Sequence, residues 1–108
     1  MVRYTAHEQY GVFCYENVVT VDKRLKYQPY AQAGIRFNNG ITELISYTTV
    51  VLILDENGIL KCTGLYSMTT RKHISSFLKE FCPNISFQDV KYAYNNGFDI
   101  DTINKKFI

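Results

Sequence analysis

At 108 residues the chain has the length of a single domain, and its 46% hydrophobic and 20% charged residues are typical of a folded protein. A net charge of +2 speaks against binding of nucleic acid by bulk charge, and it excludes an acidic imitation of DNA. The N-terminus lacks an apolar core of signal-peptide length, and the longest apolar run, 50–54, is too short to cross a membrane. We therefore expect one domain over residues 1–108, cytoplasmic and without membrane contact.

The first 29 residues carry the weakest pattern in the chain. The stretch 4–10 is compatible with a short helix that breaks near Gly11. The stretches 12–15 and 18–21 are rich in β-branched and aromatic residues, which predicts strands. The charged stretch 22–27 is expected to be a solvated connection.

An antiparallel meander is predicted for the middle of the chain. Strand patterns occupy residues 32–37, 41–47, 50–54 and 59–63. Asn-Gly at 39–40 and at 57–58 predicts hairpin turns, because such turns need positive φ. Thr48 and Thr49 are compatible either with a kink or with a continuous strand. The unbroken apolar run 50–54 predicts a central strand buried on both faces. The fold class is therefore α+β, with a meander of three or more strands.

An amphipathic helix over 70–82 is expected to pack on this sheet. Its apolar side chains fall at i, i+3, i+4 and i+7, and they are Ile74, Phe77, Leu78 and Phe81. Thr69 or Thr70 can cap its N-terminus, because a threonine oxygen accepts a hydrogen bond from an otherwise unpaired N–H group. Pro83 ends the helix.

Further short helices are predicted near the C-terminus. Residues 87–94 form the first, with Ser86 as N-cap and Asp89 completing an acidic variant of the capping box. Gly97 or a preceding asparagine can take the left-handed C-cap conformation. A short closing helix over 101–107, capped by Asp101, fits the spacing of the last apolar residues.

Three basic residues stand at the start of the long helix, where they are unfavourable. A helix N-terminus is electropositive, so each cation there costs about 0.3–1 kcal/mol. An anion site would explain them, formed by free N–H groups, hydroxyls, a guanidinium and an imidazole. Its residues would be Tyr66, Ser67, Thr69, Thr70, Arg71, Lys72 and His73. The alternative is structural: a threonine caps the helix, Arg71 and Lys72 point to water, and His73 packs beside Phe77. No glycine-rich phosphate loop precedes the helix.

No catalytic or metal-binding pattern is present in the sequence. Cys62, Cys82 or Ser67 could be paired with His73, but no nucleophile motif flanks any of them. The three cysteines are far apart and form no C-x-x-C pair, so we expect no metal and no cofactor. The carboxylates lie mostly at turns and helix starts, where capping explains them. We expect a protein that is not an enzyme.

Aromatic residues make up 15% of the chain, with nine tyrosines and seven phenylalanines. Tyrosine suits recognition surfaces, because it offers a large area with one polar end at a low entropy cost. A small core filled by few residues would also explain the excess.

The stretch 44–78 resembles a region of small uncharacterised proteins of bacteriophages and prophages. In these, a Tyr-Ser-x-Thr-Thr-x-x-His-Ile box opens a helix directly after a short meander. The matching residues here are Tyr66, Ser67, Thr69, Thr70, His73 and Ile74. Residues 1–29 and the last 25 or so depart from the resemblance. It implies a viral or mobile-element origin and carries no defined function.

Three hypotheses follow from the residues and the resemblance. The leading one is a non-enzymatic binding protein in the host cytoplasm that occupies a host protein, such as a defence nuclease, in the manner of an anti-CRISPR protein. The second is a module that binds nucleic acid or nucleotide phosphate through residues 69–73. The third is a small phage structural or assembly protein that self-associates.

Overall fold

The computed structural model describes residues 1–10 and 13–108, and for residues 8–10 and 13–15 this description covers the backbone alone. Within these ranges the strands are β1 (Val2–Tyr10), β2 (Phe13–Val21), β3 (Lys23–Arg24), β4 (Ala33–Asn38), β5 (Ile41–Ser46), β6 (Thr49–Leu54), β7 (Ile59–Cys62), β8 (Ile100–Asp101) and β9 (Lys106–Phe107). The helices are α1 (Met68–Phe81) and α2 (Phe87–Asn96). No helix among the described residues is long and apolar enough to span a membrane.

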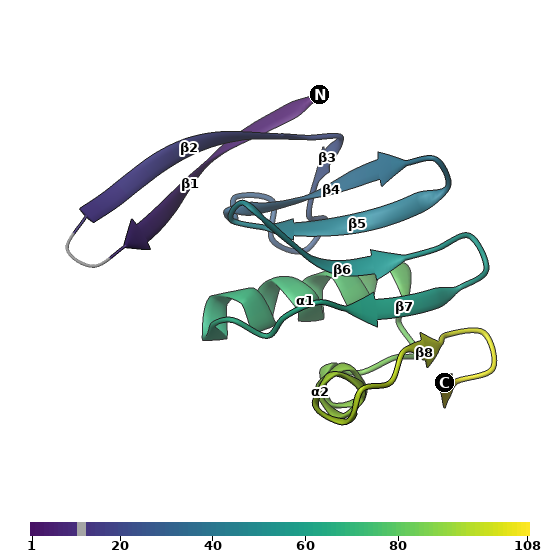
Figure 1. Cartoon of the computed structure of the whole chain (residues 1–108). Coiled ribbons are helices and arrows are strands. Elements are labelled where there is room, and N and C mark those ends of the chain that lie inside the picture. Colours follow the sequence, from purple (N-terminus) through teal and green to yellow (C-terminus); the bar gives the residue numbers. More distant parts are fainter. Residues whose placement is uncertain (11–12) are drawn as a thin grey trace.

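The architecture is α+β, as predicted, and its centre is an antiparallel meander. Seven strands form one sheet in the order β3-β4-β5-β6-β7-β8-β9, so every strand pairs with its neighbour in sequence. A second sheet contains only β1 and β2. Both helices share one hydrophobic core with the seven-stranded sheet, and α1 runs along the strands in Figure 1. This core holds α1 in place and thereby defines the outer face of the helix.

Three tight turns set the register of the meander. Asn39 and Gly40 have φ of 49° and 83°, which confirms the first predicted hairpin turn. The second contains Gly58, with φ of 81°, and Asp55 Oδ1 accepts backbone hydrogen bonds there. A third turn follows β5, where Tyr47 has φ of 56°. The chain reverses here, whereas the sequence pattern allowed a kink or a continuous strand at Thr48 and Thr49. The turn was hidden because a tyrosine occupies the left-handed position that usually favours glycine or asparagine.

The core confirms the predicted burial of the central strand and of the long helix. In β6 the adjacent residues Val51 and Leu52 are both fully buried, so both faces of the strand are covered. On α1 the predicted apolar positions Ile74, Phe77 and Leu78 are buried, and Phe81 is half-buried against the same core.

The N-terminal segment is a hairpin, so the predicted helix over 4–10 is wrong. In the part of β1 whose side chains are described, burial alternates from residue to residue: Tyr4 and Ala6 are buried with Ile45, and their neighbours in sequence are exposed. This period of two, completed by pairing with β2, outweighs the helical tendency of the stretch. The expected break near Gly11 lies outside the described residues. In Figure 1 the hairpin projects from the sheet.

Hydrogen bonds and close packing attach the hairpin to the sheet. The Tyr4 hydroxyl donates a hydrogen bond to the carbonyl oxygen of Tyr47. The side chain of Val21 lies directly over Gly34, where a Cβ would stand only 2.4 Å from Val21 Cγ2. The approach of the two layers therefore depends on glycine at position 34.

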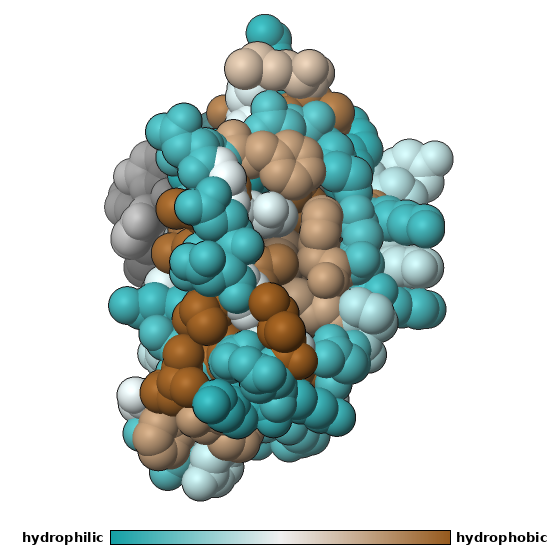
Figure 2. Space-filling view, turned by 90° about the vertical axis from the view of Figure 1, so that its right-hand side faces the viewer, coloured by the Kyte–Doolittle hydropathy of each residue, from teal (hydrophilic) through white to brown (hydrophobic). Residues whose placement is uncertain are grey.

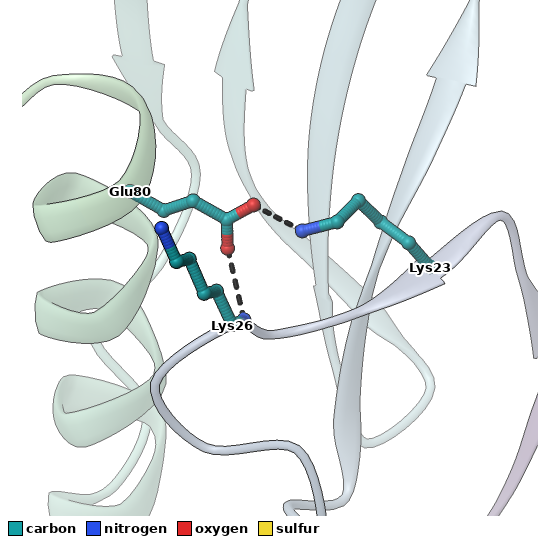
Figure 3. A network of polar contacts seen from close by, with 3 residues as sticks. All are labelled: Lys23, Lys26 and Glu80. Carbon is teal, nitrogen blue, oxygen red and sulfur yellow. Dashed lines mark hydrogen bonds and ion pairs between the residues drawn. The ribbon is translucent and has the colours of Figure 1, made fainter.

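The predicted solvated connection at 22–27 is also wrong. Lys23 and Arg24 form β3, and Leu25 is fully buried in the main core. Figure 3 shows how this segment meets the helix: Glu80 of α1 pairs with the Lys23 ammonium group and accepts a 2.9 Å hydrogen bond from the backbone N–H of Lys26.

The C-terminal region contains one predicted helix and one hairpin. The capping box at Ser86 and Asp89 is present, and Gly97 adopts the left-handed C-cap with φ of 76°. The predicted closing helix over 101–107 is wrong, because β8 and β9 pair there instead. Asp101 Oδ1 accepts hydrogen bonds from two backbone N–H groups of the following turn, which reverses the chain rather than starting a helix. Figure 2 shows the end of the molecule that carries the β4–β5 and β6–β7 turns, with hydrophobic residues gathered in its lower part.

Candidate functional site: the outer face of helix α1

The cap of α1 is Ser67, two or three residues earlier than the predicted Thr69 or Thr70. Its backbone is extended, with φ of −145° and ψ of 169°, and its Oγ accepts a 3.1 Å hydrogen bond from the backbone N–H of Thr70. Because the helix begins at Met68, Arg71 closes the first turn and Lys72 lies in the second. The unfavourable effect of the helix dipole on these cations is therefore smaller than the sequence suggested.

A buried hydrogen-bond network lies behind this helix start. Ser46 Oγ is 2.9 Å from His73 Nδ1 and 3.1 Å from Thr70 Oγ1. Thr70 Oγ1 is in turn 3.2 Å from Ser67 Oγ. Ser46, Thr70 and His73 are each only 2% exposed. Burial lowers the pKa of His73 below its usual value, so the imidazole is neutral at pH 7. These hydroxyls and this imidazole hold α1 against β5.

The seven residues of the predicted anion site do not converge on one point. Thr70 and His73 belong to the buried network, which the exposed Ser67 joins at its edge. Tyr66, Thr69 and Lys72 are exposed, and the Arg71 side chain lies over the ring of Phe87 in α2. Thr69, Lys72 and His73 do border a shallow hollow of about 360 Å³ beside residues 28–32. Anion binding at these residues stays a prediction.

A larger depression, the α1 groove, runs along the outer face of the helix. It has a volume of about 500 Å³. Its walls include Tyr27, Met68, Arg71, Lys72, Lys79 and Phe87. The described lining contains no carboxylate. Three cations, Arg71, Lys72 and Lys79, therefore face solvent among aromatic rings and the thioether of Met68. The groove therefore favours ligands that carry negative charge.

Two of the three cations of the groove lie over aromatic rings. Lys79 Nζ lies 4.3 Å from the ring centroid of Tyr27, and Arg71 Cζ lies 5.9 Å from that of Phe87. Within the described part of the chain, neither they nor Lys72 forms an ion pair. The single carboxylate of α1, Glu80, is turned away toward β3. The positive charge of this face is thus left uncompensated.

Two polar atoms at the groove have no hydrogen-bond partner among the described residues. They are Ser76 Oγ and Gln28 Oε1, and both are buried. The whole Ser76 side chain is nearly buried, since the residue is 6% exposed. An unpaired buried polar atom typically costs about 1–3 kcal/mol, and a bound ligand would remove that cost by supplying the missing partner.

Sequence reasoning found Arg71 and Lys72 but missed the rest of the groove. Lys79 lies seven residues after Lys72, two turns along the same face, and this spacing was a usable signal. Tyr27 ends the stretch that was predicted to be a solvated connection, and Gln28 follows it. The burial of Leu25 and the contacts of Glu80 with this segment bring it to the helix.

The cysteine thiols are unsuited to nucleophilic attack. Burial raises the pKa of Cys82 to about 11 and also raises that of Cys62, so both are protonated at neutral pH. Cys14 lies among the residues whose side chains are not described. Across residues 1–10 and 13–108, no group of three or more His, Cys, Asp or Glu side chains could hold a metal ion.

Fold and surface together define a small α+β protein with a basic, aromatic groove on the outside of its long helix. The chain belongs to the family of unknown function DUF8033, whose model matches residues 16–95. This match includes every residue named for the groove and leaves β1, β8 and β9 outside. No curated protein and no solved structure matches the chain.

Proposed function

We propose that this protein is a non-enzymatic binding protein that acts by covering part of another protein's surface, with the α1 groove at the centre of contact. The observation that carries the proposal is the face of three cations without ion pairs, set among aromatic rings. Aromatic residues, methionine and arginine are enriched at protein interfaces relative to the rest of the surface.

Exposed tyrosines extend this surface beyond the groove. Tyr27 and Tyr30 are 43% and 94% exposed, and Met68 at the helix start is 69% exposed. Large apolar side chains that remain in contact with water are available for burial against a partner. Together with the cations they suit a partner surface that is acidic and partly apolar.

The resemblance to phage proteins supports a finer form of the proposal. The box at 66–74 provides both the buried network and part of the groove. In a phage protein such a surface would occupy a host protein, and inhibition of a defence nuclease in the host cytoplasm, as by anti-CRISPR proteins, is the function we propose. Steric occlusion requires no catalytic group in the inhibitor.

Affinity capture from a bacterial host lysate tests the proposal. The wild-type chain should retain a specific host protein, whereas the double variant Lys72→Glu, Lys79→Glu should retain it weakly. Lys61→Glu makes the same change of charge at an exposed position outside the groove, and it should behave as wild type. If the wild type retains no host protein, the proposal is wrong.

A specific observation also favours a second candidate, binding of nucleic acid. Tyrosine rings next to cations, as at Tyr27 and Lys79, can stack on bases while the cations contact phosphate. Binding would then weaken steeply with salt, because phosphate contacts release counterions. An Arg71→Ala, Lys72→Ala variant should lose affinity for a labelled oligonucleotide at an unchanged Tm. Unchanged affinity would rule this candidate out.

A third candidate, self-association in a phage assembly, rests on the C-terminal aromatic cluster. Tyr92, Phe98 and Phe107 contact one another with ring centroids 4.8–6.3 Å apart, and each is 40–51% exposed. A surface of this kind can pair with a second copy. Size-exclusion chromatography that gives a monomer at all concentrations would exclude it.

A further inference from the structure

We propose that the α1 groove binds a glutamate or aspartate side chain presented by an extended segment of the partner protein. This inference rests on the proposed function and specifies the chemistry of the partner. Charge is the first reason. Arg71, Lys72 and Lys79 surround the groove and have no carboxylate partner in the described part of the chain, so an incoming carboxylate meets several cations at once.

The unpaired polar atoms distinguish a peptide from a simple anion. Ser76 Oγ can donate to a carboxylate, whereas Gln28 Oε1 is an acceptor and requires a donor. A peptide supplies both, because its backbone N–H groups donate and its acidic side chain accepts. Both residues belong to the lining of the groove. A phosphodiester backbone offers acceptors only, so it would leave the Gln28 oxygen without a partner.

The walls of the groove also suit a peptide. Tyr27 and Phe87 provide apolar surfaces over which Lys79 and Arg71 are held. These rings keep the cations near the groove and can cover the aliphatic part of a glutamate side chain. A volume of about 500 Å³ accommodates a few side chains rather than a folded element.

An NMR titration of the full isotope-labelled chain at low salt tests the inference. The probes are a capped tetraglutamate peptide, the matched tetraglutamine peptide, a short oligothymidylate and inorganic phosphate. Tetraglutamate should shift the amide signals of Gln28, Lys72, Ser76 and Lys79, and tetraglutamine should not. The Lys72→Glu, Lys79→Glu variant should bind tetraglutamate at least about tenfold more weakly, and Lys61→Glu as well as wild type.

A second variant tests the hydroxyl separately from the charge. Ser76→Ala removes an oxygen that has no hydrogen-bond partner, so the Tm should stay the same or rise while tetraglutamate binding weakens. Unchanged affinity of this variant for tetraglutamate would show that the Ser76 hydroxyl takes no part in the proposed contact.

Four results would overturn the inference. They are no response to tetraglutamate, an equal response to tetraglutamine, the same shifts with phosphate alone, and tighter binding of oligothymidylate in the groove. Capture of one host protein equally by wild type and by the Lys72→Glu, Lys79→Glu variant would also overturn it, while the proposed binding function would stand. Tetraglutamate binding without any captured host protein would contradict the proposed binding function, while the preference of the groove for carboxylates would stand.

Discussion

The two sides of helix α1 place their polar residues in different environments. On the inner side, Thr70 and His73 are buried and hydrogen-bonded to Ser46. On the outer side, Lys72 and Lys79 face solvent without ion pairs among the described residues. Each helical residue turns the side chain by about 100°, so neighbours in sequence reach opposite environments. A polar cluster in a sequence therefore need not be one site in space.

The largest contrast between the sides is expected from truncation of Phe77. It is fully buried between the helix and the sheet, so Phe77→Ala should lower the free energy of unfolding by about 3–5 kcal/mol. Lys79→Ala on the outer side should change it by less than about 0.5 kcal/mol. Urea denaturation measures both. Similar losses in the two variants would mean that the outer side also supports the fold.

The next largest effect is expected inside the polar network. Ser46→Ala leaves His73 Nδ1 and the Thr70 hydroxyl with one partner fewer in a buried place, which should cost about 1–3 kcal/mol. Ser75→Ala, at an exposed position of the same helix, is the matched control and should be nearly neutral. A neutral Ser46→Ala would show that the network contributes no stability.

Low pH should selectively weaken the buried contacts on the inner side of α1. Burial lowers the pKa of His73 below 6.5, so the unfolded chain takes up this proton at a higher pH than the folded chain. Stability from the neutral imidazole is complete above that pH and falls as the pH drops toward the lower folded pKa, by at most about 1.4 kcal/mol per pH unit. Urea denaturation at several pH values measures the slope. His73→Gln should flatten it, and an unchanged slope would contradict the assignment.

Removal of the cap should cost less than loss of the network. Ser67→Ala leaves the Thr70 N–H without its side-chain acceptor, and a loss of about 1 kcal/mol is expected. Thr69→Ala is the control, because Thr69 is exposed and lies inside the first turn. Thermal unfolding distinguishes the two. A larger loss of stability for Thr69→Ala than for Ser67→Ala would mean that the threonine caps the helix.

The smallest effect on stability is expected for Lys72→Glu. Lys72 lies just past the first turn, where the influence of the helix dipole has largely decayed, so the free energy of unfolding should change by no more than about 0.3 kcal/mol. Tetraglutamate binding should nevertheless weaken. A large loss of stability would mean that Lys72 has a structural function, which its exposure contradicts.

Elements with a strong local signal were predictable, and elements defined by distant contacts were not. Asn39-Gly40 and the box of Ser86 and Asp89 determine their own geometry, so the first hairpin turn and the start of α2 were correctly predicted. β1 and β9 depend on pairing partners, and without those partners both segments resembled short helices.

The candidate site was predictable only in part. The sequence drew attention to residues 66–73, but it could not show that His73 points to Ser46, because that contact spans 27 positions. The turn at Tyr47 was equally hidden, since it places a tyrosine at positive φ. Tyr27 reaches the groove because Leu25 is buried in the core and Glu80 of α1 accepts a hydrogen bond from the backbone N–H of Lys26, contacts that are distant in sequence.

Gly34 has a consequence for the mechanics of the whole molecule. A two-stranded ribbon is barely stable alone, so the N-terminal hairpin relies on its seat against β4. Any larger residue at this position would collide with Val21 and tilt the N-terminal hairpin away from the meander. The helices pack on the shared core rather than against the ribbon, so the groove would keep its shape. One absent methyl group thus lets the hairpin close on the outer face of the meander, where the two share a small second core.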